Sequence, residues 1–356
     1  MRVVHLPYNV ASQIQIQVKA LRGAGVETRG LVMNASSTQS SAGMEIYDAF
    51  PDEPRFSLRW VRDRIARSRS VLAAIKWADV VHYQYGNAFA LPGRLDAAFA
   101  GGLKKLRLVT FWGTDIRVPE IECRENPYFA AIYPELHKRW GTRKSSYRVQ
   151  EWYAKRGFHC VLGSESMLPH VDRSLFRDVH MVRGAVDSEN LYPVYPEPER
   201  LKVVIAHAPS DQLVKGTAAV LSAISQLQRK RLDLEFILIH NTPREKALEI
   251  VQHADVFLDQ FVLGAYGTAA IEAMALGKPV VCYIKPSLVR EYPSDLPIVN
   301  ASQEQLVSAL EELILDGQLR RGLGIRGRQF VDKYHDSRMA GEQLKTLYHK
   351  LLAGMG

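Results

Sequence analysis

A short segment from Asp259 to Tyr283 combines glycines, one acid and a helix start in a pattern that suits phosphate and sugar chemistry. Gly264 and Gly267 bracket a loop, and Gly267 or Thr268 is expected to cap the helix that follows. Amides at a helix N-terminus bind phosphate oxygens, and the helix dipole adds to that attraction. Glu272 lies one turn into this helix, where a carboxylate can accept hydrogen bonds from sugar hydroxyls. The segment predicts a nucleotide or nucleotide-sugar site.

A lysine earlier in the chain predicts a further contact to phosphate. Lys215 stands directly before Gly216, which is expected to open a helix after the strand Lys202–Ala206. A compact positive charge beside phosphate oxygens stabilises a leaving group that gains negative charge. A solvated lysine at a helix start is the alternative, and the position after a strand favours the phosphate contact.

Three polar residues end predicted strands in the second half of the chain, where parallel sheets bind ligands. His207 ends one strand, and His240 with Asn241 ends the next. These positions suit contacts to a nucleotide base or ribose. A histidine at a strand end can equally be a packed residue, so both interpretations stay open.

The segment Thr110–Arg117 closes a predicted strand in the first half. Trp112 can donate one hydrogen bond and can stack on a sugar face, but it cannot transfer a proton. Asp115 is the leading polar candidate for orienting a bound substrate, with a turn aspartate that binds local amides as the alternative. The other residues expected to face the ligand-binding edge are Tyr8, Asn9, Gln13, His82 and Arg117.

The segment beginning at Gly264 resembles the donor-site motif of the GT-B glycosyltransferases, in particular the large retaining family called glycosyltransferase family 4-like or group 1. That family has two glutamates eight residues apart. Gly-aromatic-Gly follows the first glutamate, and Ala-Met-Ala-x-Gly-x-Pro-Val follows the second. In this chain Ala265, Tyr266 and Gly267 fall on the first pattern, Glu272 on the second glutamate, and Ala273–Val280 on the tail.

The resemblance implies a role for each matching residue. Glu272 would bind the donor ribose, and Lys215 would neutralise the donor diphosphate. Tyr266 and Gly267 would supply backbone contacts to the sugar or diphosphate. In the first half, Asp115 keeps a strand-end motif that faces the donor sugar in the family.

Three positions depart from the family pattern: Gly264 replaces the first glutamate, Trp112 a histidine, and Ser210 an arginine. The resemblance still implies sugar transfer from a nucleoside-diphosphate sugar, with retention and without a metal; the chain also lacks an Asp-x-Asp motif. The donor is a substrate, and no cofactor is expected. Two alternatives remain, a non-catalytic nucleotide-sugar-binding protein and a GT-B nucleotide-sugar epimerase.

Alternating strand-like and helix-like stretches in both halves predict α/β domains with parallel sheets. The resemblance implies the GT-B fold, with two doubly wound Rossmann-like domains facing a cleft and a C-terminal helix crossing back to the first domain. The expected parts are an acceptor-binding domain (residues 1–185), a proline-containing linker (186–200), a donor domain (201–335) and the terminal helix (336–356).

The charge of the chain is uneven. The net charge is +8, and residues 1–183 carry 27 Lys and Arg against 17 Asp and Glu. This excess points to an anionic partner such as a membrane surface, a lipid phosphate, an acidic glycan or nucleic acid, with a solvated basic surface as the alternative. No nucleic-acid-binding motif is present, and the donor motif argues against nucleic acid. The expected acceptor is a sugar-containing, lipid-linked or small molecule. The arginine-rich stretch Arg55–Arg69 could lie on an anionic membrane or pack its apolar stripe on the sheet.

The compartment is predicted from what the sequence lacks. No apolar run approaches the ~20 residues of a membrane span, and the N-terminus has no signal-peptide core. The three cysteines share no metal-ligand spacing and are expected to stay reduced. A cytoplasmic protein is expected. The basic charge of the first half could also bring it into peripheral contact with the inner face of the membrane.

Overall fold

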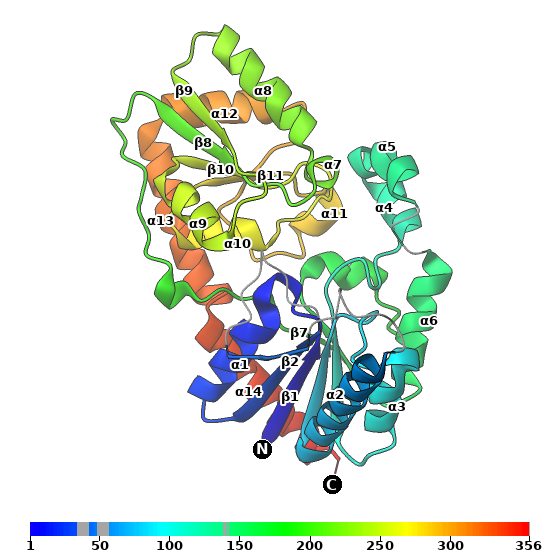
Figure 1. The fold of residues 1–356 in the computed structure, drawn as a ribbon. Helices are drawn as coiled ribbons and strands as arrows, with labels where there is room; N and C mark the ends of the chain where they lie inside the picture. The colour runs from blue at the N-terminus through cyan, green and yellow to red at the C-terminus, as the bar shows by residue number, and fades with distance from the viewer. Residues whose placement is uncertain (34–42, 48–56, 138–139, 141, 356) are drawn as a thin grey trace. The chain divides into compact units, whose positions relative to one another are not determined.

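A computed structural model describes residues 1–33, 43–47, 57–137, 140 and 142–355. The chain forms two compact units, each with its own sheet (Figure 1). Unit 1 consists of Met1–Val118, Gly141–Gly184 and Ser337–Gly356, and unit 2 of Pro119–Trp140 and Ala185–Asp336. The segment Pro119–Trp140, which the sequence assigned to the N-terminal domain, therefore groups with unit 2.

Unit 1 has a parallel seven-stranded sheet of order β3-β2-β1-β4-β5-β6-β7. The order reverses between β1 and β4, which makes their carboxyl ends the place where such sheets bind ligands. The strands are β1 (Arg2–Pro7), β2 (Glu27–Met33), β3 (Glu45–Tyr47), β4 (Val80–Gln84), β5 (Leu106–Phe111), β6 (His159–Leu162) and β7 (Val179–Met181). The helices are α1 (Gln13–Gly23), α2 (Leu58–Trp77), α3 (Leu95–Gly101), α6 (Arg143–Ala154) and α14 (Ser337–Ala353), with 3-10 turns at Val10–Ser12, Pro92–Arg94 and Glu165–His170.

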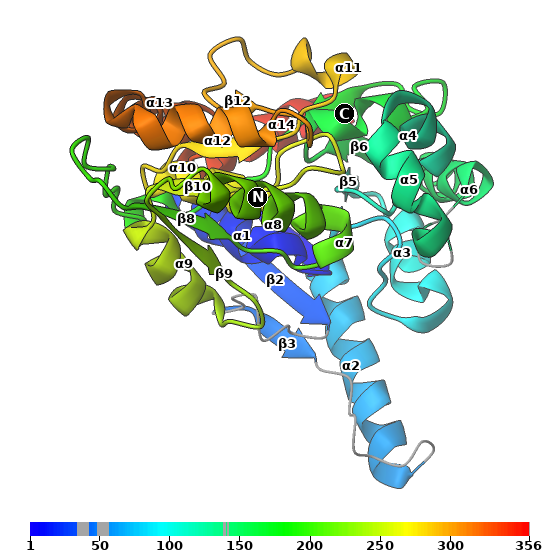
Figure 2. The same cartoon turned by 90° about the horizontal axis from the view of Figure 1, so that it is seen from above.

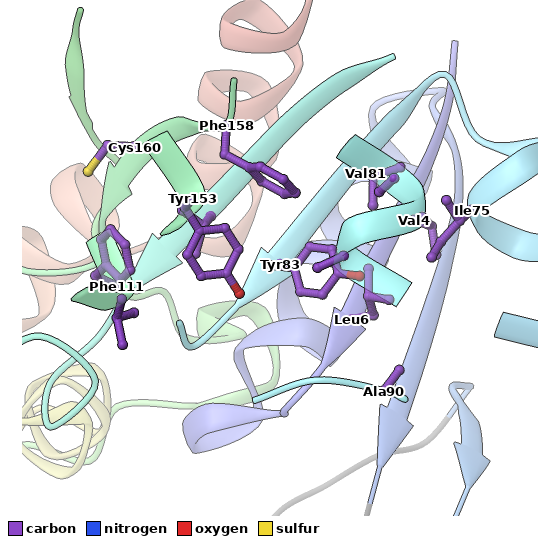
Figure 3. Packing of buried hydrophobic residues seen from close by; sticks show 14 of the residues in the cluster. Val4, Leu6, Ile75, Val81, Tyr83, Ala90, Phe111, Tyr153, Phe158 and Cys160 are labelled. Atoms are coloured by element: carbon purple, nitrogen blue, oxygen red, sulfur yellow. The ribbon is translucent and has the colours of Figure 1, made fainter. Parts of the chain in front are cut away.

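Alternation along the strands divides the core of unit 1 between two sheet faces. Val4 packs in a cluster with Ile75 of α2 and Tyr153 of α6. In Figure 3 Val4 lies beside Ile75, and Tyr83 of the same cluster lies between them and Tyr153. Val3, one residue earlier, packs in a different cluster with Leu344 of α14. The C-terminal helix thus covers the second face together with α1, as the GT-B resemblance implies.

A buried hydrogen-bond chain runs across this second face. The Gln84 amide N–H donates to His5 Nδ1 (3.1 Å), so His5 carries its proton on Nε2 and donates to the Tyr348 hydroxyl (3.2 Å). Tyr348 then donates to His82 Nδ1 (2.7 Å), and His82 Nε2–H donates to Thr110 Oγ1 (2.7 Å). Every link has one donor and one acceptor only when both histidines are neutral. Burial lowers the pKa of His5 to about 3 and that of His82 well below its usual value.

The neutral histidines predict that unit 1 loses stability in acid. The pKa of His5 in the folded protein lies below its unfolded value, so the unfolded chain binds the proton first. The stabilisation is complete above about pH 6.5 and is lost as the pH falls toward about 3. At pH 5 the loss from His5 alone is about 2 kcal/mol.

Urea unfolding at pH 7 and pH 5 measures this effect. The variant His5→Gln should lose less stability on acidification than the wild type, whereas His349→Gln, at an exposed position of α14, should behave as the wild type does. Equal acid sensitivity of all three proteins would show that His5 titrates normally.

Unit 2 has a parallel five-stranded sheet of order β12-β11-β10-β8-β9. Its order reverses between β8 and β10, so the ends of these two strands form its ligand-binding edge. The strands are β8 (Val203–His207), β9 (Leu234–Leu238), β10 (Val256–Leu258), β11 (Val280–Cys282) and β12 (Val299–Asn300). The helices are α4 (Pro119–Glu125), α5 (Pro127–Leu136), α7 (Gln212–Lys215), α8 (Thr217–Arg229), α9 (Arg244–His253), α10 (Thr268–Ala275), α11 (Pro286–Val289), α12 (Leu306–Leu315) and α13 (Gly317–Tyr334), with a 3-10 turn at Ser188–Asn190.

The helices of unit 2 also cover both sheet faces. Ile205 of β8 packs with Val220 of α8 and Leu310 of α12. Ala206, the next residue, packs on the other face with Ile271 of α10 and Phe330 of α13. These two layers hold the loops after β8 and β10 at one edge of the sheet.

Helix α12 begins at Leu306, after a turn in which the Ser302 hydroxyl accepts from the Gln305 amide. The apolar stripe of α2 packs on the sheet over only part of the helix. Ile75 is fully buried, whereas Val61 and Ile65 are 39% and 48% exposed. Arg55 of the expected arginine-rich stretch lies outside the described residues.

Figure 2 shows why the two halves of α2 differ. The C-terminal half lies along the sheet, and the N-terminal half extends past it. None of the helices in the described part of the chain is long and apolar enough to cross a membrane.

Candidate functional site

Two local features of the loop between β8 and α8, a helix cap and a glycine, fix the position of Lys215. The Asp211 carboxylate caps α7 by accepting from the amides of Leu213 and Val214, both at 3.1 Å. Gly216 then has φ +74°, and a Cβ there would also lie 3.1 Å from Phe261. Glycine is therefore required where α7 ends and α8 begins, and Lys215 is held at the carboxyl end of β8.

Lys215 forms an ion pair with an acid that directly follows β10. Its Nζ lies 2.7 Å from Asp259 Oδ1, and the other oxygen, Oδ2, accepts from the Gly267 amide at 2.7 Å. The Asp259 side chain is 1% exposed and that of Lys215 is 13% exposed. Asp259 therefore joins the lysine and the start of α10 at the point where the strand order of unit 2 reverses.

Gly267 leaves room for this arrangement. A Cβ at Gly267 would lie 3.3 Å from Lys215 Nζ and 3.6 Å from both Asp259 carboxylate oxygens. Thr268 and Ala269 are the first two residues of α10, so their amides have no acceptor within the helix. A charged lysine and helix-terminal amides together form a site for an anion such as phosphate.

Glu272 lies on α10 one turn beyond these amides and pairs with a residue of α9. The Arg244 guanidinium donates to Glu272 Oε1 through Nε (3.0 Å) and through Nη2 (2.5 Å). A cavity of about 400 Å³ adjoins this pair, and Arg244 lines it with Tyr192 and Leu248. Glu272 is thus a charged acceptor near the helix start, held from one side by Arg244.

Gly264, at the position of the first glutamate, has a backbone that a side chain would strain. Its φ is +69°, and a Cβ would lie 2.9 Å from Lys285 Cβ and 3.1 Å from Asn126 Nδ2. Lys285 is fully buried and forms ion pairs with Glu122 (2.9 Å) and Glu125 (3.2 Å) of α4. A glutamate at position 264 would therefore collide with Lys285 and Asn126, whereas glycine fits the packing of α4 and its acids beside this loop.

The remaining loop residues support the backbone rather than project into solvent. Ala265 is buried, and its carbonyl accepts from the Gln260 side-chain amide. The Tyr266 hydroxyl lies 3.1 Å from His335 Nε2, and its ring packs at 4.8 Å from that of Tyr292. Thr268 is partly exposed at the first position of α10, which Gly267 caps.

The histidines expected at strand ends separate into one structural and one exposed residue. His207 is fully buried; its Nδ1–H donates to the Leu258 carbonyl (2.9 Å) and its Nε2 accepts from Thr217 Oγ1 (3.0 Å). Burial lowers the pKa of His207, which keeps it neutral. This geometry supports the packed alternative for His207. His240 and Asn241 are exposed after β9, and Asn241 has φ +50°.

In unit 1, Asp115 organises two loops at the carboxyl edge of the sheet. Its carboxylate accepts from the amides of Gly86 (3.0 Å) and Gly113 (2.8 Å), and more weakly from those of Trp112 and Ile116. Burial raises the pKa of Asp115, and these amide bonds oppose the increase. The arrangement supports the turn-aspartate alternative, because both oxygens are used by the backbone.

Trp112 packs over two glycines beside this loop. A Cβ at Gly163 would lie 2.2 Å from the indole, and one at Gly184 would lie 3.3 Å from it. The indole N–H donates to Gln84 Oε1 at 2.9 Å, which joins Trp112 to the buried histidine chain.

The other residues expected at the edge of unit 1 are largely buried. Asn9 Oδ1 accepts from the amide of Ile14, in the first turn of α1, at 2.8 Å, and Gln13 is 1% exposed. His82 is enclosed under α14, and Arg117 is 7% exposed. These four side chains therefore lie beneath the surface of the edge, whereas the Tyr8 side chain is 43% exposed to solvent there.

Two residues of the unit 2 site were missed from the sequence, Asp259 and Arg244. Asp259 directly follows a buried strand and opens the motif segment, which is the signal that could have revealed it. Arg244 begins a helix after the loop that carries His240, but nothing in its spacing indicates the contact to Glu272. Within the described residues, no cluster of three histidine, cysteine or acidic side chains is arranged to hold a metal.

Comparison with protein families matches residues 216–330 to the model described as glycosyl transferases group 1. The matched range includes Gly216, the Gly264–Gly267 loop and Glu272, and it begins one residue after Lys215. A comparison with curated proteins finds no match. The resemblance to group 1 glycosyltransferases is confirmed in this segment.

Solved structures similar to the whole chain include glycosyltransferases. A sucrose-phosphate synthase from Thermosynechococcus elongatus has a TM-score of 0.66 at 14% identity, with 99% of this chain and 100% of that chain covered. A glycosyltransferase from Rickettsia africae has a TM-score of 0.62 at 12% identity, covering 99% and 98%. HepE from Anabaena, in complex with UDP-glucose, has a TM-score of 0.61 at 13% identity, covering 99% of both chains. The predicted GT-B fold is confirmed.

Proposed function

We propose that this chain, which has the GT-B fold and a group 1 glycosyltransferase segment at residues 216–330, transfers a sugar from a nucleoside-diphosphate sugar to an acceptor. The observation that carries the proposal is the group formed by Lys215, Asp259 and the N-terminus of α10 at the switch point of unit 2. HepE, whose structure holds UDP-glucose, supports this class of donor.

Each residue of this group has a place in the proposed reaction. The donor diphosphate binds at the amides that begin α10, and Lys215 stabilises the negative charge that develops when the bond between the sugar and the diphosphate breaks. Asp259 holds the Lys215 ammonium and the Gly267 amide in fixed positions before the donor binds. Glu272 accepts hydrogen bonds from the ribose hydroxyls, with its free rotation limited by Arg244.

Retention of configuration and independence of metal belong to the proposal through the family resemblance. The acceptor hydroxyl forms the new bond on the face that the diphosphate leaves, and its proton passes to the leaving phosphate. This route requires no proton-accepting side chain, so Trp112 at the position of the family histidine is compatible with transfer. The anomeric proton coupling of the product, read by NMR, reports retention.

Unit 1 is proposed to bind the acceptor, and its charge bears on where the enzyme works. Exposed arginines at positions 62 and 64 flank the exposed Val61 and Ile65 on the projecting half of α2, and the exposed Arg69 follows one turn later. Basic and apolar side chains on one exposed helix suit peripheral contact with an anionic membrane face. A cytoplasmic enzyme that acts on a sugar-containing or lipid-linked acceptor fits this pattern.

Thermal unfolding with a panel of nucleotides tests the proposed function. UDP, GDP, ADP and dTDP, each alone and as its glucose or mannose derivative, should show one base that raises Tm, since a ligand that binds only the folded state stabilises it. The same concentration of the matching nucleoside without phosphates is the control and should raise Tm much less. No increase with any member of the panel would contradict a donor site.

A further inference from the structure

An aromatic pair lies at the carboxyl edge of the unit 1 sheet, where the strand order reverses. Pro7 of β1 pairs with Gln84 of β4, so the next residues, Tyr8 and Tyr85, follow neighbouring strand ends. Their ring centroids are 5.4 Å apart and the rings are inclined by 43°. This is the position at which doubly wound sheets bind ligands, and neither ring has a role in the donor site of unit 2.

The second ring of the pair is held firmly. The Tyr85 hydroxyl lies 2.6 Å from Thr114 Oγ1, in the loop after β5. The next residue, Gly86, donates its amide to Asp115, which organises that same loop. Tyr8 packs on this fixed ring and is 43% exposed, so the pair presents an aromatic surface to solvent.

The backbone beneath the pair is strained. Tyr85 has φ +75°, a left-handed conformation that costs a residue with a side chain of order 1–3 kcal/mol. Ala11 and Ser12, in the loop that follows Tyr8, have φ +46° and +63°. Strain of this kind persists where the surroundings fix a binding geometry. Glycine would remove the strain at position 85, yet the chain carries a tyrosine there.

We propose that Tyr8 and Tyr85 form a platform on which a pyranose ring of the acceptor stacks. The electron-rich face of a tyrosine attracts the C–H face of a sugar, while the tyrosine hydroxyl and Thr114 offer hydrogen bonds to sugar hydroxyls. The inference rests on the proposed function, since it names the acceptor as a molecule that ends in a sugar.

Saturation-transfer NMR with four methyl glycosides (glucose, mannose, galactose and N-acetylglucosamine) tests the platform. At least one should receive saturation from the wild-type protein. Tyr8→Ala and Tyr85→Gly should reduce that signal at least fivefold. Tyr147→Ala is the matched control, because Tyr147 is 42% exposed on α6 of the same unit, and it should leave the signal unchanged.

The variant Tyr85→Gly adds a readout that separates binding from folding. Glycine accepts the left-handed φ, which offsets the lost contacts of the Tyr85 side chain with Tyr8 and Thr114. This variant should therefore still unfold cooperatively at a Tm close to that of the wild type, while it loses the sugar signal. The inference is overturned when none of the glycosides receives saturation, or when both platform variants keep the signal. The nucleotide panel reads the donor site independently: stabilisation by a nucleotide without sugar binding would leave the proposed function standing and remove the platform. Sugar binding without stabilisation by any nucleotide would leave the sugar platform standing and remove the proposed donor site.

Discussion

Replacing Lys215 by alanine is expected to lower turnover roughly 30- to 900-fold, which corresponds to ~2–4 kcal/mol of transition-state stabilisation. The reason is positional, since Lys215 is fixed at the end of α7, beside the helix-terminal amides of α10. A charge already in place when the diphosphate departs needs no rearrangement, so its effect falls mainly on kcat. Release of nucleoside diphosphate from the donor measures this loss.

The structure offers a matched lysine and a partner variant for this experiment. Lys246→Ala removes an exposed lysine that pairs with Glu249 at 2.8 Å in the same unit, and it should leave turnover unchanged. Asp259→Asn should also lower turnover, because Lys215 and the Gly267 amide lose the carboxylate that holds them together. A Lys215→Ala enzyme with the wild-type rate would remove the lysine from the mechanism.

The second large effect is expected at Glu272. The variant Glu272→Gln should weaken nucleoside-diphosphate binding about 10- to 150-fold, because hydrogen bonds to a charged group contribute ~1.5–3 kcal/mol. Calorimetric titration gives the affinity directly. Glu235→Gln, which breaks an exposed ion pair with Lys202 of the same unit, is the control and should bind as the wild type does.

Arg244 makes it possible to separate two roles of Glu272. If the carboxylate binds ribose, Arg244→Ala should weaken binding much less than Glu272→Gln, because the acceptor oxygens remain. Equal losses in the two variants would mean that Glu272 only positions Arg244. Wild-type affinity in Glu272→Gln would place this side chain outside the nucleotide site.

The sequence predicted the donor unit well because its signals are local. Gly216 and Gly267 each mark the start of a helix, where little room is left for a side chain. The strand and the helix that flank each glycine follow from their amino-acid composition. Helix α10 was therefore placed to within one residue at its start. The family model then matches the same segment.

Long-range contacts explain what the sequence did not predict. Lys285 pairs with Glu122, which is 163 residues away, and only the fold brings them together. His82 looked like a ligand-facing residue because it lies near a strand end, but Tyr348 of the last long helix closes over it. Asp115 was ranked as a substrate contact, and its four backbone partners come from the loops after β4 and β5. No periodicity in the sequence could reveal such partners.

Hydrogen–deuterium exchange with and without the nucleoside diphosphate that stabilises the protein most tests the central claim directly. A donor at the switch point of unit 2 should slow exchange in the peptides that span Lys215–Val220 and Gly264–Glu272, and should leave the edge of unit 1 at Tyr8 unchanged. Protection confined to other peptides, with these two segments unaffected, would contradict the donor site proposed for this chain.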